Sequence, residues 1–413
     1  MSLLLYHLFL FLYKTGIRLV APWNPKARLW LQGRRIFPEL NFSGKTIWVH
    51  CSSLGEFEQG RPVLEAIRKQ YPGFPIVLSF FSPSGYEIRK DYSGADRVIY
   101  LPLDSPRNAK KLVKALQPAL VIWVKYEYWY YYLNELHKQQ IPILLVSGIF
   151  RPSQPFFRFY GAIWRYMLSC YKQIFVQNQS SAELLAGIGF DRQVAVSGDT
   201  RFDRVIAIAE QQQDIPRIQS FIGNRPVLVA GSTWPEDEEE LVHFVKKNPG
   251  IRFIIAPHEV DEERIEEIRK TFHDIILYSN YSDEMRLPDQ IHVMVIDNIG
   301  MLSKLYRYAD ISYIGGGFGN DGIHNVLEAA VYHCPVVFGP VYEKFMEARD
   351  LVSLGGAFSV ENALELEEVL NHLFSNTDEK EKAGKAAGDY VYAQQGATQK
   401  IMDYIMENRL LTN

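Results

Sequence analysis

The sequence predicts an α/β protein of two domains, each built around a parallel sheet. Short runs rich in Val, Ile and aromatic residues alternate with longer amphipathic stretches, a pattern typical of strand–helix units. The pattern starts again after a polar stretch in the middle of the chain. At 413 residues the chain is too long for one ordinary core and suits two domains of roughly 200 residues each. We therefore expect two Rossmann-like domains that face each other across a cleft.

Most of the predicted strands are continuously apolar, as strands buried on both faces of a sheet should be. In the first half they cover residues 46–50, 75–80, 97–101, 119–124, 143–147, 173–177 and 194–197. In the second half they cover residues 226–230, 252–256, 274–278, 292–296, 310–314 and 335–338. The polar stretch 207–216 ends in a Pro and is the predicted linker. The predicted parts are a segment 1–22, a domain 23–208 and a domain 209–413, whose last helix is a candidate to pack back on the first domain.

The N-terminus is both apolar and basic. Residues 1–38 carry six basic side chains and no acidic one, which leaves 38 basic against 48 acidic residues in the rest of the chain. The apolar run 3–13 is well short of the roughly 20 residues that span a bilayer comfortably. Its positive charge follows the run, whereas that of a secretory signal precedes it. We predict a helix that associates with an anionic membrane surface; the alternative is a helix packed on the first domain.

The composition argues against several classes of protein. With 47% hydrophobic and 22% charged residues the chain is globular rather than disordered, and a net charge of -4 gives no support to a nucleic-acid partner. The three cysteines are far apart and show neither metal-ligand spacing nor a disulfide framework, which favours a reducing compartment. No His, Asp and Glu set has the spacing of a metal site, so we predict no metal.

Two carboxylates follow buried strands. Glu56 comes after strand 46–50 through a turn with Ser and Gly, and Glu127 follows strand 119–124 among aromatic side chains. Because open α/β sheets bind ligands at the carboxyl ends of their strands, these residues are candidates for an acid–base pair. Apolar surroundings would raise a carboxyl pKa toward the working range. The alternatives are a first-turn acid that complements the helix dipole for Glu56, and an aromatic core or protein-facing surface around Glu127.

Arg201 lies in the segment Gly198–Asp203, directly after the last strand of the first half. A guanidinium there is a candidate to neutralise negative charge on a leaving phosphate. The alternative is that Arg201 pairs with Asp199 or Asp203 within a turn.

The most specific pattern lies at residues 310–329, where a strand enters a glycine-rich loop and a helix leaves it. Such a loop exposes backbone N–H groups that attract phosphate. The G-x-G-x-x-G spacing falls on Gly317, Gly319 and Gly322. This loop follows about four earlier strands of its domain rather than the first, which argues against NAD. Asn325 and Glu328, three apart on the expected helix, favour contacts with a ribose or base, and so a nucleotide-sugar donor.

The order and spacing of these segments resemble the Kdo transferase family, whose members transfer 3-deoxy-D-manno-octulosonic acid (Kdo) from CMP-Kdo to a lipid A precursor. The resemblance runs over nearly the whole chain. It rests on His50–Glu56, the Glu127 strand, Gly198–Asp203, Gly231–Trp234, Asp297–Gly300, and His324–Glu328 followed by Phe338–Pro340. It implies a GT-B architecture with an N-terminal membrane anchor at the cytoplasmic face of the bacterial inner membrane.

The resemblance also implies roles for single residues. Glu56 matches the general base of the family, Glu127 matches an acid that stabilises the transition state, and Arg201 takes the place of a family Lys. The segments that hold CMP correspond to Pro257, His258, Ile299, Gly300, Met301, Asn325, Val326, Leu327 and Glu328. The implied reaction is an inverting displacement that needs no metal or other cofactor.

The chain departs from the family pattern in the donor segments. The family has an Arg between Pro and His, whereas Pro257 is followed directly by His258. Residues that are common in the family are also replaced at four other positions, by Met301, Gly317, Ile323 and Lys344.

The alternatives from the sequence are another GT-B glycosyltransferase, a nucleotide-sugar epimerase, or a non-catalytic membrane-associated protein that binds nucleotide.

Overall fold

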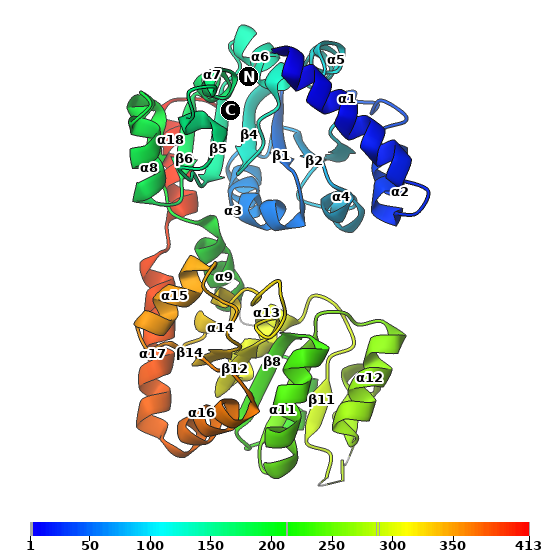
Figure 1. The fold of residues 1–413 in the computed structure, drawn as a ribbon, viewed down its shortest axis with the longest axis vertical. Helices are drawn as coiled ribbons and strands as arrows, with labels where there is room; N and C mark the ends of the chain where they lie inside the picture. Colours follow the sequence, from blue (N-terminus) through cyan, green and yellow to red (C-terminus); the bar gives the residue numbers. More distant parts are fainter. Residues whose placement is uncertain (1–2, 212–213, 286, 289, 413) are drawn as a thin grey trace. The chain divides into compact units, whose positions relative to one another are not determined.

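The computed structural model describes residues 3–211, 214–285, 287–288 and 290–412. The chain forms two compact units: unit 1 comprises Met1–Arg204 and Gln395–Asn413, and unit 2 comprises Val205–Gln394. Each unit is a sheet with helices against its faces (Figure 1). The predicted division at residue 208 falls inside helix α9 (Thr200–Glu210), which begins in unit 1 and ends in unit 2.

Unit 1 contains a sheet of seven strands in the order β3-β2-β1-β4-β5-β6-β7, in which every pair is parallel. The order reverses between β1 and β4, as in a doubly wound fold. All the strands predicted for the first half are present. They are β1 (Thr46–Cys51), β2 (Ile76–Phe80), β3 (Arg97–Tyr100), β4 (Pro118–Val124), β5 (Ile143–Gly148), β6 (Gln173–Val176) and β7 (Val194–Val196).

Four helices of unit 1, α2, α4, α5 and α8, begin at Pro or with a capping side chain. Asn24 accepts a hydrogen bond from the Ala27 N–H ahead of Pro25, and Ser105 does the same for Asn108 ahead of Pro106. The helices are α1 (Leu3–Val20), α2 (Pro25–Gln32), α3 (Leu54–Gln70), α4 (Pro83–Arg89), α5 (Pro106–Leu116), α6 (Tyr130–Lys138), α7 (Ala162–Ser169), α8 (Gln179–Ala186) and α18 (Ala397–Glu407), with short 3-10 turns η1 (Pro155–Phe157) and η2 (Asp191–Gln193).

Alternate residues of β1 enter two different cores, one on each face of the sheet. Trp48 packs in a cluster with Trp123 and Tyr132, whereas Val49 belongs to a cluster that also contains Ile405 of α18. The C-terminal helix therefore packs against unit 1. Its start is fixed by the Asp203 carboxylate, which accepts the N–H groups of residues 396 and 398 at 2.6 Å each.

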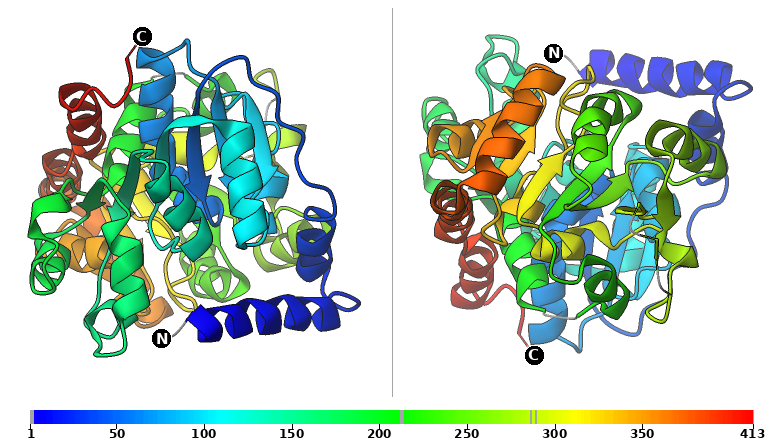
Figure 2. Two further views of the ribbon diagram at one scale, coloured as in Figure 1. Left: turned by 90° about the horizontal axis from the view of Figure 1, so that it is seen from above. Right: turned by 90° about the horizontal axis from the view of Figure 1, so that it is seen from below.

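Helix α1 packs along unit 1 through one stripe and exposes apolar side chains elsewhere. Tyr6 and Leu10 are buried, and Tyr13 and Ile17 pack against the same core. The exposed apolar side chains include Leu4, Phe11 and Leu19 at 76%, 67% and 66% exposure. The helix has 18 residues and a mean hydropathy of 1.4, so by length and composition alone it qualifies as a membrane span. Both views of Figure 2 show α1, in dark blue, as a straight helix at the outside of unit 1.

Unit 2 contains a second sheet of seven parallel strands, in the order β10-β11-β9-β8-β12-β13-β14. The predicted strands of the second half are all present, and β14 had not been predicted from the sequence. The strands are β8 (Val227–Thr233), β9 (Arg252–Pro257), β10 (Ile275–Leu277), β11 (Val293–Val295), β12 (Ile311–Ile314), β13 (Val336–Phe338) and β14 (Ala357–Ser359).

The helices of unit 2 are α10 (Pro216–Ile222), α11 (Pro235–Lys247), α12 (Glu262–Phe272), α13 (Leu302–Leu305), α14 (Leu327–Ala330), α15 (Met346–Ser353), α16 (Ala363–Ser375) and α17 (Thr377–Ala393), with 3-10 turns η3 (Tyr278–Asn280) and η4 (Tyr306–Tyr308). The helix expected after the glycine-rich loop is only four residues long. Asn325 precedes this helix and Glu328 lies within it, so the expectation that both lie on one helix face was wrong for Asn325.

Candidate active site

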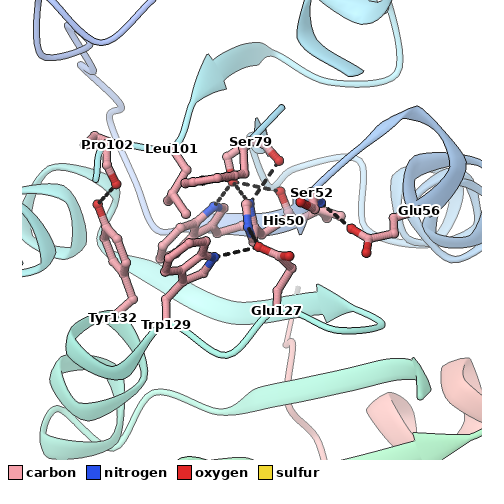
Figure 3. Close-up of polar contacts among 12 residues, drawn as sticks. His50, Ser52, Glu56, Ser79, Leu101, Pro102, Glu127, Trp129 and Tyr132 are labelled. Carbon is pink, nitrogen blue, oxygen red and sulfur yellow. Dashed lines mark hydrogen bonds and ion pairs between the residues drawn. The ribbon is translucent and has the colours of Figure 1, made fainter. Parts of the chain in front are cut away.

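Glu127 lies in a network of buried side chains beyond the end of β4 (Figure 3). Its Oε2 accepts hydrogen bonds from Trp129 Nε1 at 2.6 Å and from His50 Nε2 at 2.9 Å. The Tyr171 hydroxyl donates to the Glu127 carbonyl at 2.9 Å. Lys125, between strand and network, has a φ of 66°, a left-handed conformation that turns the chain at this point. The carboxylate is thus held from two sides by ring N–H groups.

His50 connects Glu127 to the interior of the sheet. The imidazole is fully buried in β1, and its Nδ1 lies 2.8 Å from the hydroxyl oxygen of Ser79 on the neighbouring strand. That hydroxyl accepts a hydrogen bond from Trp48 Nε1 at 2.7 Å. Because an ionised carboxylate only accepts hydrogen bonds, the contact with Glu127 assigns an imidazole proton to Nε2, while Nδ1 also lies 3.1 Å from the carbonyl oxygen of Ser79. Figure 3 shows this chain of contacts.

β1 leads through the turn at Ser52 and Ser53 into α3, and Glu56 lies in the first turn of that helix. Its carboxylate accepts the backbone N–H of Ser52. Burial and, next in size, the negative charge of Glu127 raise the pKa of Glu56, which comes to about 8 because the Ser52 N–H bond and the charge of Lys125 act in the opposite direction. The first-turn position considered from the sequence is therefore present, together with an environment that makes this carboxyl unusually basic.

Arg201 lies in the first turn of α9, after the left-handed Gly198. Its Nε and Nη2 atoms both lie 2.8 Å from Asp199 Oδ2, and its backbone N–H donates to Oδ1 at 2.9 Å. The local pairing with Asp199 is thus formed. The Arg201 side chain remains 29% exposed.

Three rings meet beyond three neighbouring strands of unit 2. Trp234 follows β8, His258 follows β9, and His324 lies in the loop after β12. His258 stacks on Trp234 with ring centroids 4.7 Å apart and on His324 with centroids 4.4 Å apart. Trp234 Nε1 donates to His324 Nε2 at 3.1 Å, which leaves the proton of neutral His324 on Nδ1. Burial and then the charge of His258 lower the pKa of His324 to about 4.

The glycine-rich loop is tied to α11 by one carboxylate. Asp237 is fully buried, and its Oδ2 accepts the N–H groups of Gly316 at 2.8 Å and Trp234 at 2.9 Å. Its Oδ1 accepts the Tyr313 hydroxyl at 2.8 Å. A Cβ at Gly317 would lie 2.5 Å from the backbone nitrogen of Gly339, so this glycine allows two backbone segments to meet. The glycine pattern therefore has a packing role at this position.

The remaining predicted donor residues lie in loops and the short helix of unit 2. Asn325 Nδ2 donates to Glu328 Oε1 at 3.1 Å, so the amide and the carboxylate hold each other. Ile299 is 89% exposed, and Gly300, with a φ of 97°, precedes Met301 at the start of α13. Val326 and Leu327 are buried.

Several residues of these networks were missed by the sequence predictions. His50 and Ser79 are polar positions within otherwise apolar strands, a signal that marks them as buried polar groups in need of partners. Trp129 and Trp234 belong to segments that the sequence analysis singled out but were not named as site residues, and Asp237 carried no comparable signal. Across the residues that the structure describes, no group of three or more His, Cys, Asp or Glu side chains is arranged to hold a metal ion. That the reaction requires no metal stays a prediction.

The comparison with protein families decides the identity of unit 1. Residues 27–204 match the family described as 3-deoxy-D-manno-octulosonic-acid transferase. Unit 1 is therefore a domain of the Kdo transferase family. The likeness extends beyond unit 1, because curated Kdo transferases, whose names state a glycosyltransferase activity, match over most of the chain at 24% and 26% identity.

Two relatives illustrate the extent of the match. A 3-deoxy-D-manno-octulosonic acid transferase of Haemophilus influenzae is 24% identical over 377 residues, which cover 87% of this chain and 86% of the relative. A bifunctional glycosyltransferase/methyltransferase of Fusobacterium nucleatum is 28% identical over 353 residues, 81% of this chain. The chain spans only about half, 54%, of that second relative.

The fold is shared with solved GT-B-type structures. The crystal structure of UDP-GlcNAc 2-epimerase from Neisseria meningitidis bound to UDP-GlcNAc matches with a TM-score of 0.62 at 15% identity, covering 88% of this chain and all of that one. At this identity the likeness shows the fold alone. The predicted GT-B class is confirmed.

Proposed function

We propose that this protein transfers Kdo from CMP-Kdo to a lipid A precursor at the cytoplasmic face of the bacterial inner membrane. The observation that carries the proposal is the raised pKa of Glu56, about 8, beside the fixed carboxylate of Glu127 in the Kdo transferase domain. A general base works best when its pKa lies near the operating pH. Glu56 meets this condition, whereas an ordinary exposed carboxylate does not.

In the proposed reaction, the ionised Glu56 carboxylate accepts the proton of an acceptor hydroxyl as that oxygen attacks the anomeric carbon. The bond between the anomeric carbon and the CMP phosphate oxygen breaks, and CMP leaves with the bonding electrons. Sugar transfer develops positive charge on the ring, which a fixed carboxylate such as Glu127 stabilises. Because His50 and Trp129 already hold Glu127, little reorganisation is needed during the reaction.

The leaving CMP acquires negative charge, and we assign its neutralisation to Arg201. The Asp199 contacts hold the guanidinium in one orientation while leaving part of it exposed. In unit 2 we assign the nucleotide to the stacked rings with His258, to Gly300 and to the Asn325–Glu328 pair. The Nδ1–H of the neutral His324 adds a hydrogen-bond donor where the family's Arg is missing after Pro257.

We also propose that α1 lies along the membrane surface rather than across the bilayer. Tyr6 and Ile17, near the two ends of the helix, both pack on unit 1, and the Tyr6 hydroxyl donates to Asp104 at 2.6 Å. Crossing the bilayer would require these contacts to be given up, while the exposed apolar faces suit a helix in the interface. Labelling of single cysteines introduced at Leu4 and Leu19 tests this. Both positions should lie at the same depth in the membrane, and positions on opposite sides of the bilayer would contradict the proposal.

The proposed activity is tested with CMP-Kdo and a lipid A precursor. Wild-type protein should form the Kdo-containing lipid, and Glu56→Ala should lower turnover at least about 100-fold, as expected for a positioned general base. Glu365→Ala is a matched control, since the Glu365 carboxylate also accepts an N–H four residues earlier, that of Glu361 at 2.9 Å, at the start of α16. Absence of transfer by wild type, or equal losses in the two variants, would reject the proposal.

A further inference from the structure

A cavity of about 560 Å³ in unit 1 is lined by α1, α2, the segment after α2 and the chain that follows β3. Its wall contains four basic side chains and no acidic one. The basic residues are Lys14 and Arg18 of α1, and Arg34 and Arg35 beyond α2. This cavity is separate from the Glu127 network and has no part in the proposed reaction.

Arg34 is a largely buried cation in the wall of this cavity. Its N–H groups donate to the carbonyls of Trp30 at 3.2 Å, Phe81 at 2.6 Å and Leu101 at 2.9 Å. Its guanidinium lies over aromatic rings, the nearest at 4.1 Å. No carboxylate pairs with it among the described residues. Burial lowers its pKa to about 9, so it is still charged at neutral pH.

A buried charge is costly unless an opposite charge compensates it. Carbonyls and ring faces solvate Arg34 in part, but they leave a full positive charge. Elsewhere in unit 1 arginines meet carboxylates: Arg68 pairs with Asp96, and Arg89 lies 2.8 Å from Glu58. Lys14, Arg18 and Arg35 are exposed, and the ion pairs found in the described ranges of the chain include none of them. The cavity therefore concentrates uncompensated positive charge.

The position of the cavity relative to α1 restricts what fills it. The same helix supplies Lys14 and Arg18 to the cavity wall and exposes Leu4, Phe11 and Leu19 to the surroundings. An occupant must therefore be anionic and lie beside an apolar surface. A phosphomonoester carries about 1.5 to 2 negative charges at neutral pH and three strong acceptor oxygens, which suits several basic side chains at once.

We propose that this cavity binds the phosphomonoester headgroup of a membrane lipid. The inference rests on the proposed function only in placing α1 at a membrane, and it requires no transferase activity. Arg34 forms the fixed wall of the site, and the exposed side chains of Lys14, Arg18 and Arg35 close around the phosphate. The bound headgroup would place unit 1 at a defined height and rotation on the membrane surface.

The test measures binding of the full chain to vesicles. Phosphatidylcholine vesicles with phosphatidic acid, a phosphomonoester, are compared with vesicles in which phosphatidylglycerol, a phosphodiester, gives the same surface potential. The pocket variant is Arg18→Ala/Arg35→Ala. The matched control is Lys26→Ala/Arg28→Ala, which removes two exposed charges of the same segment outside the cavity.

Wild type and the control should bind phosphatidic acid vesicles roughly tenfold more tightly than the matched phosphatidylglycerol vesicles. The reason is that a phosphomonoester makes one more charge-assisted hydrogen bond in the cavity than a phosphodiester. The pocket variant should lose this preference. Wild type without a preference, or equal losses in both variants, would overturn the proposal.

Soluble glycerol phosphate should bind weakly; tight binding that the pocket variant abolishes would instead assign the site to a soluble metabolite. If transfer of Kdo fails while the vesicle preference holds, only the proposed function falls.

Discussion

The Nε2 atom of His50 lies 2.9 Å from Oε2 of Glu127, so a residue of β1 and a residue just beyond the end of the neighbouring β4 form one fixed unit. The imidazole is held in turn by the hydroxyl and the carbonyl oxygen of Ser79. Glu127 is thereby fixed where its charge raises the pKa of Glu56. The basicity of the proposed catalytic carboxyl is thus a property of the pair rather than of Glu56 alone.

Glu127→Gln should shift the acid limb of the pH–rate profile to lower pH. A general base acts in its ionised form, so in the wild type kcat/KM should rise with pH through about 8, the pKa of Glu56. Removing the neighbouring charge lowers that pKa, while loss of the fixed carboxylate should lower the maximal rate by about 10- to 100-fold. The profile of kcat/KM against pH measures both effects.

The control Glu39→Gln, which removes an exposed charge of the same unit, should change neither the pH of the acid limb nor the maximal rate. An acid limb at the wild-type pH in Glu127→Gln would contradict the assignment.

Glu56→Gln should stabilise the protein at alkaline pH while abolishing activity. The folded-state pKa of Glu56 is raised from 4.5 to about 8, so the unfolded chain ionises first. Wild type therefore loses stability as pH rises between these two values, and the variant does not. The difference in free energy of unfolding should grow by a few kcal/mol, to order of magnitude, from pH 5 to pH 8. Denaturant unfolding at the two pH values gives the difference, and a gap independent of pH would show that Glu56 is not desolvated.

Trp129→Phe should reduce turnover as well as stability. The substitution keeps an aromatic ring against Phe81 but removes the N–H that donates to Glu127. A hydrogen bond to a charged group contributes about 1.5 to 3 kcal/mol, so kcat should fall about tenfold or more if the bond positions Glu127 in the transition state. A purely structural role would lower the melting temperature and leave kcat unchanged. Steady-state kinetics and a thermal melt distinguish the two outcomes.

The strands of both sheets were predictable because their apolar runs are continuous and bounded by polar or turn residues. β14 escaped because it has only three residues and follows Gly355 and Gly356, so no run stands out. Similarly, α14 begins only at Leu327, and the expected face shared by Asn325 and Glu328 is replaced by a hydrogen bond between their side chains.

The positions of Glu56 and Glu127 followed from the rule that ligand sites lie at the carboxyl ends of strands. Their partners did not, since His50 and Glu127 are 77 residues apart and only the parallel pairing of β1 with β4 makes them neighbours. The contact of Trp234 with His324 has the same origin, because these residues are 90 apart in sequence and follow β8 and β12, which are neighbours in the sheet.

Asp237→Asn should weaken unit 2 and its affinity for the donor together. The wild-type carboxylate accepts three donors, the N–H groups of Gly316 and Trp234 on one oxygen and the Tyr313 hydroxyl on the other. An amide keeps one acceptor oxygen and turns an NH2 group toward the remaining donors, which costs about 1 to 3 kcal/mol for each buried group left unsatisfied. The free energy of unfolding should fall by that amount, and the KM for CMP-Kdo should rise as the glycine-rich loop and the Trp234 ring lose their common support.

Glu236→Gln, one position earlier on the exposed face of α11, is the matched control and should alter neither the free energy of unfolding nor the KM. Reduced stability with an unchanged KM would mean that the loop held by Asp237 does not contact the nucleotide.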